Sequence, residues 1–430
     1  MLDLNNKSVS LVGYGVSNKA LCRYLMKRGV VPTVRAPQAC DLPKGMTGVF
    51  GDGYLNTEED VVFRSPGVCP SGISKRGEVY TEARFALEKI KSKCIGITGS
   101  DGKTTTSTLV YRMLCQGGKN AFLCGNIGLP IIDLCDSVGE NDVLVAELSS
   151  FQLCDMCPVL DVAVITNITQ NHLDWHTDMD DYIQAKANIL KNARRCVLNY
   201  DDPVLRTLCP KGGVYFSLKD CRSLLCSQWD FAHVCDGNVC YNNEVLFPVS
   251  EIRLKGRFNV YNVLSAIGCV YGTVDTDSIR KVAREFLGVD NRMEAVAEIN
   301  GVEFINSAID TTPSRTNATL SAFDLERVIL IVGGYDKHLS YGVLKDVLTR
   351  AKAVVALGEN RDKIAEASCG RHIINVNTLK EAVQVAYSLA SRGDFVILSP
   401  ASASFDMFKN YKEKAKCFKE AVKGLVNGED

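Results

Sequence analysis

The stretch Cys94-Ile-Gly-Ile-Thr-Gly-Ser-Asp-Gly-Lys-Thr-Thr-Thr106 carries the strongest structural signal in this 430-residue chain. Its first residues, with Ile95 and Ile97, are typical of the end of a buried strand, and residues 104–113 have the pattern of a helix. A glycine-rich loop lies between them. The order strand, loop, helix predicts a phosphate-binding loop.

The residues of this loop suit phosphate chemistry. Gly99 and Gly102 let backbone N–H groups turn toward phosphate oxygens, and the helix N-terminus adds partial positive charge. Lys103 is expected to reach the outer phosphates, and the Thr104 hydroxyl to help hold Mg²⁺. Five residues separate Gly96 from Gly102, whereas the standard loop has about four. A tight strand-to-helix turn with an exposed lysine therefore remains the alternative.

Composition limits the possible functions. Lys plus Arg number 49 and Asp plus Glu 50, so no global charge favours nucleic acid or a membrane surface. No transmembrane run and no secretory leader are found, and the 18 cysteines are scattered, which indicates a reduced cytoplasmic protein with free thiols. The one C-x-x-C, Cys154 to Cys157, has no second pair at zinc-ribbon spacing, which favours chance over a zinc site.

The N-terminal region begins like a dinucleotide-binding fold. A strand at 7–12 is followed by the glycine turn 13–18 and a helix. Asn18 replaces the third glycine of the dinucleotide motif, and Arg35-Ala36 stand where an acidic residue is expected, so nicotinamide binding is disfavoured. The turn either holds a nucleotide diphosphate or marks a close helix–strand contact. A second turn, Ser65-Pro-Gly67, follows another strand.

The middle of the chain adds candidate metal ligands. Glu147 follows the buried run Val-Leu-Val-Ala, where phosphate-binding ATPases place a Mg²⁺ ligand; a surface charge is the alternative. His172 and His176 are spaced i, i+4 but lack the glutamate of His-Glu-x-x-His, which excludes a zinc protease and leaves a structural pair or a histidine beside Mg²⁺. Lys186 by itself is read as a solvated lysine.

The remaining segments complete an α/β pattern. A helix is predicted for residues 78–90 and small hairpins for 212–250. A further α/β domain follows, with strands predicted at 302–305, 327–332, 353–357 and 395–398. Loops 333–338 and 399–411 come after two of these strands, at the ends where open α/β sheets bind ligands.

Together, these segments resemble the Mur ligase family in content and order. The shared motifs are residues 96–105, Gly125-Asn126-Ile-Gly128, Glu147-Leu-Ser-Ser-Phe-Gln-Leu, Asn171-His172, Lys186, residues 256–262, Asn291-Arg292, residues 333–337 and residues 399–411. The resemblance covers nearly the whole chain. The Glu147 motif and Ser-Pro-Ala-x-Ala-Ser-Phe-Asp are similar to the family members that add D-glutamate.

The resemblance implies an α/β protein of three domains. These are a Rossmann-like UDP-sugar-binding domain (1–92), a central P-loop ATPase domain with a parallel sheet (93–297) and a Rossmann-like amino-acid-binding domain (298–430). It also implies ATP, Mg²⁺, UDP-N-acetylmuramoyl-L-alanine and D-glutamate as ligands. The implied protein is a cytoplasmic monomer that serves peptidoglycan synthesis through an acyl phosphate and binds neither nucleic acid nor membrane.

The resemblance further implies roles for individual residues. The ATP-binding residues would be Gly99, Ser100, Gly102, Lys103, Thr104, Thr105, Asn259 and Arg292. The Mg²⁺ ligands would be Thr104, Glu147, His172 and Lys186, the last carbamylated, and the catalytic residues Lys103, His172 and Lys186. The nucleotide-sugar would contact Gly15, Ser17, Ser65, Gly67 and Asn126, and D-glutamate would contact Thr311, Lys337, Ser404 and Tyr411.

Three positions depart from the family pattern. Ser307 stands where an Asp is expected to orient the ATP ribose, Asn291 replaces the His before Arg292, and Ala36 occupies the place of an acidic residue near uracil. Three alternatives stay open: a sister Mur ligase, a ligase like folylpolyglutamate synthase, and a pseudo-ligase that senses a UDP-sugar. No Asn-Lys-x-Asp guanine motif is visible, which disfavours a P-loop GTPase.

Overall fold

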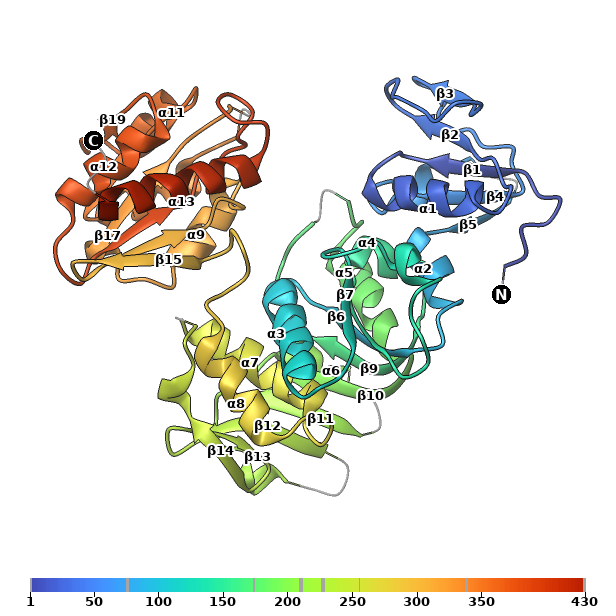
Figure 1. Cartoon of the computed structure of the whole chain (residues 1–430), viewed down its shortest axis with the longest axis horizontal. Coiled ribbons are helices and arrows are strands. Elements are labelled where there is room, and N and C mark those ends of the chain that lie inside the picture. Colours follow the sequence, from blue (N-terminus) through green and yellow to red (C-terminus); the bar gives the residue numbers. More distant parts are fainter. Residues whose placement is uncertain are drawn as a thin grey trace. The chain divides into compact units, whose positions relative to one another are not determined.

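The computed structural model describes residues 2–74, 77–172, 175–208, 212–225, 229–254, 256–336 and 339–427. The chain divides into two compact units, Met1–Arg253 with Phe258–Glu285, and Leu254–Arg257 with Phe286–Asp430. The first unit contains two sheets and the second unit one, each flanked by helices (Figure 1). The predicted α/β class with parallel sheets is confirmed, whereas the domain boundaries remain predictions.

The first sheet has five parallel strands in the order β3-β2-β1-β4-β5. Its elements are β1 (Val9–Val12), α1 (Val16–Met26), β2 (Thr33–Ala36), β3 (Gly48–Phe50), β4 (Val61–Arg64), β5 (Glu78–Tyr80) and α2 (Glu82–Leu87). The strand order reverses between β1 and β4, so the turns after these two strands lie where open α/β sheets bind ligands.

The helix predicted for residues 78–90 is wrong at its start. Residues Glu78–Tyr80 extend the sheet by pairing with β4, because this edge offers unpaired backbone groups. The helix begins only after Thr81, whose hydroxyl accepts a hydrogen bond from the backbone N–H of Arg84.

The second sheet has nine strands in the order β14-β13-β12-β11-β10-β9-β6-β8-β7, antiparallel only from β12 to β14. Its strands are β6 (Lys93–Thr98), β7 (Ala121–Gly125), β8 (Val143–Glu147), β9 (Val159–Ile165), β10 (Asn192–Asn199), β11 (Gly213–Ser217), β12 (Trp229–Cys235), β13 (Asn238–Tyr241) and β14 (Glu244–Pro248). The helices are α3 (Lys103–Gln116), α4 (Ser150–Leu153), α5 (Met179–Ala187), α6 (Pro203–Thr207), α7 (Arg257–Val270) and α8 (Thr276–Glu285).

Strand β6 lies between β8 and β9, so the glycine loop leaves the sheet beside the ends of both neighbours. The register pairs Ile97 with Glu147 and Thr98 with Ile165. The hairpins predicted for 212–250 are confirmed for β12 to β14, but β11 instead runs parallel between β10 and β12.

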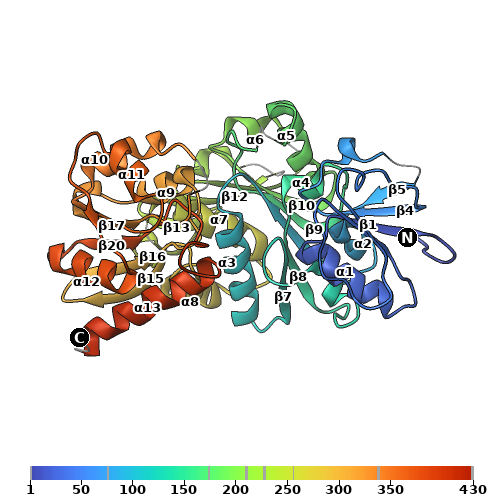
Figure 2. The same cartoon turned by 90° about the horizontal axis from the view of Figure 1, so that it is seen from above.

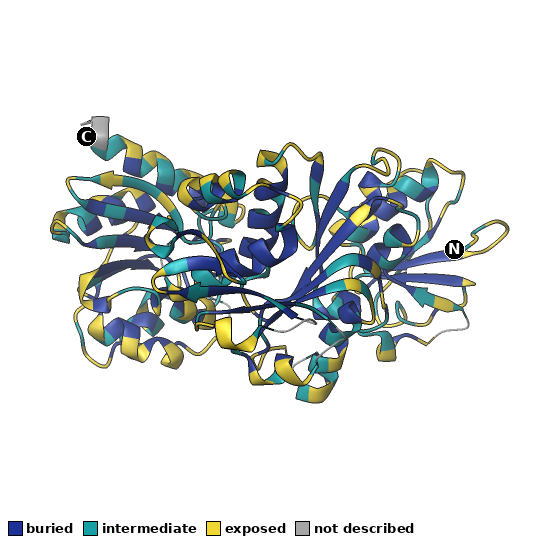
Figure 3. Cartoon of the chain, turned by 90° about the horizontal axis from the view of Figure 1, so that it is seen from below, coloured by how far each residue is buried: buried dark blue, intermediate teal, exposed yellow. Residues whose placement is uncertain are grey.

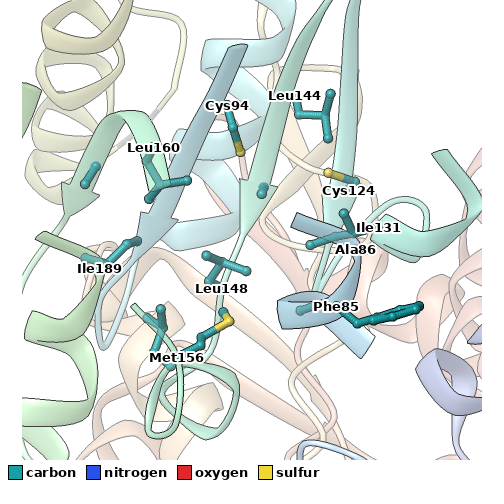
Figure 4. Close-up of a cluster of buried hydrophobic side chains, with 14 of the residues drawn as sticks. Phe85, Ala86, Cys94, Cys124, Ile131, Leu144, Leu148, Met156, Leu160 and Ile189 are labelled. Carbon is teal, nitrogen blue, oxygen red and sulfur yellow. The ribbon is translucent and has the colours of Figure 1, made fainter. Parts of the chain in front are cut away.

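The first two sheets share one hydrophobic core. Phe85 of α2 belongs to it together with Ile131 and, in strand β6, Cys94 (Figure 4). Glu82 of α2 is buried too, and its carboxylate accepts a hydrogen bond from the Ile132 N–H at 2.7 Å. Burial raises the pKa of Glu82 to about 7. Helix α2 is therefore fixed to the second sheet by apolar burial and by a buried hydrogen bond.

The third sheet has the order β15-β16-β20-β17-β18-β19 and is parallel except for the pair β15–β16. Its strands are β15 (Glu294–Ile299), β16 (Val302–Asn306), β17 (Val328–Val332), β18 (Ala353–Ala356), β19 (Ile374–Asn375) and β20 (Phe395–Leu398). The helices are α9 (Pro313–Leu320), α10 (Lys345–Arg350), α11 (Arg361–Ala367), α12 (Leu379–Leu389) and α13 (Tyr411–Asn427). All four predicted strands are present, and β15 and β19 are additional.

Helices cover both faces of this third sheet. Helices α12 and α13 pack their apolar residues on one face, and α9, α10 and α11 pack theirs on the other (Figure 2). The inner strands β16, β17, β18 and β20 are mostly buried, whereas the edge strands β15 and β19 are partly exposed. The outward faces of the helices are exposed, as their amphipathic patterns require (Figure 3). Within the described ranges, no helix has the length and apolar character needed to cross a membrane.

Candidate active site

The loop between β6 and α3 requires glycine at two positions. Gly99 has φ +145° and Gly102 has φ +79°, both in the region that side chains rarely adopt. A Cβ on Gly99 would lie 1.9 Å from the Thr166 hydroxyl oxygen, and one on Gly102 would lie 2.3 Å from Asn262 Oδ1. The glycine pattern therefore reflects close packing as well as backbone conformation.

Residues that follow β9 hold the loop in place. The backbone N–H groups of Ser100 and Asp101 donate to the carbonyl and side-chain oxygens of Asn167, both at 2.9 Å. The Thr166 hydroxyl donates to the Asp101 carbonyl at 2.6 Å. These bonds fix the conformation of the loop before any ligand binds.

Lys103 lies over the loop that precedes it. Its ammonium donates to the carbonyl oxygens of Gly99 at 2.8 Å and Ser100 at 2.7 Å. Thr104 and Thr105 are buried in the first turn of α3. Since the N-cap residue Gly102 has no side chain, it cannot cap the N–H groups of this turn, which suits a phosphate.

Glu147 ends β8 beside the loop and is buried, with 1% of its surface exposed. Its Oε1 accepts a hydrogen bond from the Asn126 side-chain amide at 2.9 Å. Its Oε2 is also buried and finds no hydrogen-bond partner among the described residues. A buried carboxylate oxygen without a partner is costly, and a cation would satisfy it. The surface-charge alternative for Glu147 is wrong.

Lys186 of α5 is buried, so the solvated reading is wrong. Its ammonium donates to the Gly99 carbonyl at 2.9 Å, the same oxygen that Lys103 contacts, and lies 4.5 Å from the centre of the Tyr182 ring. Burial, reinforced by the charge of Lys103, lowers the pKa of Lys186 well below its ordinary value. Packing of α5 on the loop, which the local sequence does not reveal, explains the difference.

The two histidines of the segment after β9 have different environments. His176 is buried, with Nδ1 2.9 Å from Asp181 and Nε2 3.0 Å from the Ser150 hydroxyl, which is a structural arrangement. His172 is exposed, has φ +57°, and its ring packs edge-on against Phe151 at 5.0 Å. Of the pair, His172 is therefore the one that a ligand can reach.

Asn259, in α7, is buried close to the loop. It accepts a hydrogen bond from the Asn262 amide at 3.0 Å, and Asn262 Oδ1 in turn accepts from the Thr106 hydroxyl at 3.3 Å. Since Asn262 also packs against Gly102, α7 contacts the first turn of α3. This places Asn259 near the predicted phosphate site.

The predicted nucleotide-sugar residues of the first sheet meet at its switch point. Gly15 is the N-cap of α1, Ser17 lies in its first turn, and the Ser65 hydroxyl donates to the Gly13 carbonyl at 2.9 Å. Gly67 is exposed, and its carbonyl accepts a hydrogen bond from the Trp175 indole at 3.1 Å.

The departures at residues 35 and 36 leave the end of β2 without a free carboxylate. Arg35 is paired with Glu59 at 3.0 Å, and Ala36 is buried. The close helix–strand contact at the glycine turn is also present, because the Asn18 amide donates to the carbonyls of Gly13 at 2.7 Å and Phe63 at 3.1 Å.

In the second unit, candidate residues surround the ends of β16 and β20. Ser404 is buried, and its hydroxyl finds no hydrogen-bond partner in the part of the chain that is described. Thr311 lies in the loop after β16, and Tyr411 begins α13. Lys337 lies outside the described residues. Lys414, which the sequence did not single out, is fully buried and donates to the Gly333 carbonyl at 3.0 Å.

The other two family departures, Asn291 and Ser307, are both held by hydrogen bonds in this unit. The Asn306 amide donates to Asn291 Oδ1 at 3.1 Å and to Glu294 at 3.0 Å. Ser307 is fully buried, and its hydroxyl accepts a hydrogen bond from the Met293 N–H at 3.3 Å. Burial raises the pKa of Asp310, and the charge of the half-buried Arg292 opposes part of this rise.

Comparison with known proteins places this arrangement in a family. Residues 97–270 match the profile of the Mur ligase middle domain, and residues 291–402 match that of the Mur ligase glutamate ligase domain. The chain is 39% identical to the UDP-N-acetylmuramoylalanine--D-glutamate ligase of Acetivibrio thermocellus, over 98% of this chain and 97% of that protein. The chain belongs to the Mur ligase family. This Mur ligase is also 36% identical to the enzyme of the same name from Clostridium tetani, over 98% and 97% of the two chains.

Solved structures support the fold of this Mur ligase. The UDP-N-acetylmuramate-alanine ligase of Thermotoga maritima aligns with a TM-score of 0.61 at 19% identity, over 98% of this chain and 100% of that one. A pseudomurein peptide ligase type C from Methanothermus fervidus aligns with a TM-score of 0.55 at 18% identity, with the same coverage.

Sequence reasoning missed several residues that organise the site of this Mur ligase. Thr166 and Asn167 fix the loop, Phe151 packs against His172, and Trp175 packs against Phe151. The motif Glu147-Leu-Ser-Ser-Phe-Gln contains Phe151, so the motif was the available signal for that residue. Thr166, Asn167 and Trp175 could not be identified from the sequence, because what they contact depends on the order of the strands in the sheet.

Proposed function

We propose that this protein is an ATP-dependent amide ligase that adds D-glutamate to UDP-N-acetylmuramoyl-L-alanine in peptidoglycan synthesis. The observation that carries the proposal is the preformed loop with Lys103 above it and the unpaired oxygen of Glu147 beside it. The name shared by relatives at 36–39% identity over nearly the full length supports the choice of substrates. We expect it to act as a monomer in the cytoplasm.

The residues present fit ATP and Mg²⁺. The triphosphate would be held by Gly99, Ser100, Gly102, Lys103, Thr104 and Thr105, with Asn259 and Arg292 toward the nucleoside. The unpaired oxygen of Glu147 calls for a cation, and Thr104, His172 and a carbamylated Lys186 would complete the ligands. Mg²⁺ would supply positive charge that offsets repulsion between the anionic substrates.

Lys186 is suited to carbamylation. Its lowered pKa favours the neutral amine, which is the form that reacts with carbon dioxide. The amine nitrogen bonds to the carbon of carbon dioxide and loses a proton, so the carbamate carries a negative charge and would place an anion beside the cation Lys103. A buried anion next to Glu147 would then bind metal.

The chain's own residues account for the remaining steps. The acceptor carboxylate is ionised at neutral pH, so its attack on the γ-phosphate, which releases ADP, needs charge neutralisation by Lys103 and no base. D-glutamate, held by Thr311, Lys337, Ser404 and Tyr411, then attacks the acyl phosphate through its amine and displaces inorganic phosphate. His172 is exposed and is the candidate to accept the proton that this amine loses. Gly15, Ser17, Ser65, Gly67 and Asn126 would hold the nucleotide-sugar.

A substrate-omission assay tests the function. ADP release should require the nucleotide-sugar acceptor, and formation of the amide should require D-glutamate in addition. Replacing D-glutamate with L-alanine or meso-diaminopimelate should abolish amide formation, and a preference for either would identify a sister ligase. A protein that binds the UDP-sugar yet releases no ADP with all three substrates would refute the proposal and support the sensor alternative.

A further inference from the structure

Arg64, the last residue of β4, is fully buried in the first unit. Its guanidinium reaches the segment that follows β8. Nε donates to Asp155 Oδ2 at 2.8 Å, and Nη2 donates to the Phe151 carbonyl at 2.7 Å and to Cys154 Sγ at 3.1 Å. A residue of the first sheet thus binds the helix α4 of the second sheet, three residues after Glu147.

The same guanidinium also shapes the turn after β4. Nη1 donates to the carbonyl oxygens of Pro66 and Val68, both at 3.2 Å. These residues enclose Gly67 and follow Ser65, the two positions expected to contact the nucleotide-sugar. All three guanidinium nitrogens therefore donate hydrogen bonds. Nη1 donates to the turn, and Nε and Nη2 donate to α4 and the two residues that follow it.

Aromatic residues provide further contacts between the turn after β4 and helix α4. The Trp175 indole donates to the Gly67 carbonyl at 3.1 Å, and its ring lies 4.6 Å from that of Phe151. Phe151 in turn packs against His172 at 5.0 Å. The turn after β4, the helix α4 and the segment with His172 are thus one continuous network of contacts.

We propose that Arg64 is a positioning residue that aligns the turn Ser65–Val68, and the nucleotide-sugar bound there, with the Glu147 edge of the second sheet. The inference rests on the proposed function. Only a planar guanidinium presents donors in several fixed directions, whereas a lysine would satisfy one group of acceptors and leave the others buried without partners. Asp155 supplies the opposite charge that makes burial of Arg64 tolerable.

The test compares Arg64→Lys with Arg23→Lys. Arg23 also links the first sheet's helices to the second, through Asp133 at 3.3 Å, but it is exposed and does not touch the turn. We expect Arg64→Lys to raise KM for UDP-N-acetylmuramoyl-L-alanine about tenfold or more, with KM for ATP and D-glutamate within about twofold. Arg23→Lys should leave all three constants unchanged. A merely structural role would lower Tm and leave the three KM values in their wild-type ratio.

Trp175 gives a second readout that does not need turnover. The chain has two tryptophans, and Trp229→Phe leaves Trp175 as the single reporter. Titration with UDP-N-acetylmuramoyl-L-alanine should change its fluorescence, with a Kd raised in folded Arg64→Lys and unchanged in Arg23→Lys. Equal affinity in the two variants would overturn the proposal. A wild type that binds the nucleotide-sugar but forms no amide would refute the proposed function and leave this comparison intact.

Discussion

Two glycine turns in the first unit look alike in sequence and differ in chemistry. The turn after β1 and the loop after β6 both lead from an interior strand into a helix, at the strand ends where open α/β sheets bind ligands. The loop after β6 brings two lysines, Lys103 and Lys186, to one carbonyl oxygen. In the turn after β1, the side chain that holds the turn is the neutral Asn18, whose amide donates to the Gly13 carbonyl.

The difference shows what a strand–turn–helix element provides by itself. Both turns present backbone N–H groups at a helix N-terminus, which is enough to bind an anion. Only the loop after β6 adds two lysines and, beside it, a Glu147 oxygen that has no hydrogen-bond partner among the described residues, and activation of a phosphate requires such charges. The turn after β1 is accordingly expected to bind and not to react.

The largest expected effect comes from removing the charge at the loop after β6. Lys103→Ala should lower kcat about a hundredfold or more, because the ammonium stabilises charge that develops on the transferred phosphoryl group. Lys93→Ala, an exposed lysine at the start of the same strand, is the matched control and should be near wild type. Steady-state ADP release measures both variants. Near-normal turnover in Lys103→Ala would remove the loop from the mechanism.

Substitution of Lys186 tests whether this lysine is carbamylated, and therefore negatively charged, in the active enzyme. Lys186→Ala should lower kcat roughly thirtyfold or more, and added formate or acetate should restore part of the rate by replacing the missing carboxylate. Lys191→Ala, an exposed lysine nearby, should show neither the loss nor the rescue. A variant that loses activity but does not respond to small carboxylates would argue that Lys186 acts as a cation.

A pair of alanine substitutions compares the two turns sterically. Gly99→Ala should lower kcat/KM for ATP roughly tenfold or more, since its Cβ would lie 1.9 Å from the Thr166 hydroxyl and φ is +145°. Gly15→Ala places its Cβ 3.8 Å from the nearest atom, and its turn is expected to contact the nucleotide-sugar and not ATP, so we expect kcat/KM for ATP to change by less than about twofold. Equal effects at both positions would mean that the loop after β6 is not preformed.

The smallest effect concerns stability and not rate. Asn18→Ala removes the hydrogen bonds that the Asn18 amide donates to the carbonyls of Val12, Gly13 and Phe63, and should lower the free energy of unfolding by about 1–3 kcal/mol. Chemical denaturation measures this change. Asn5→Ala at an exposed site should change the unfolding free energy by less than about 0.5 kcal/mol. An unaltered stability in Asn18→Ala would show that the turn does not depend on this side chain.

Local patterns predicted much of the fold. The glycine loop, the strands of the third sheet and the hairpins β12 to β14 follow from hydrophobic runs and turn residues that act over short distances. The prediction of a helix over 78–90 was wrong at its start because Glu78–Tyr80 find a pairing edge on β4, which no local pattern reports. The strand ends that carry Glu147 and the loop 399–411 were placed correctly for the same short-range reason.

The sequence by itself determined most of the strands, tight turns and helix N-termini, since these depend on neighbouring residues, but not strands such as β5 that form only against a partner edge. Tertiary structure alone decided that Lys186 is buried on Gly99, 87 positions away in the chain, and that Arg64 reaches α4. Burial and charge environment arise from residues brought together by sheet order and helix packing. The pKa of Lys186 and the alignment of the two ligand-binding edges therefore become visible only in the folded chain.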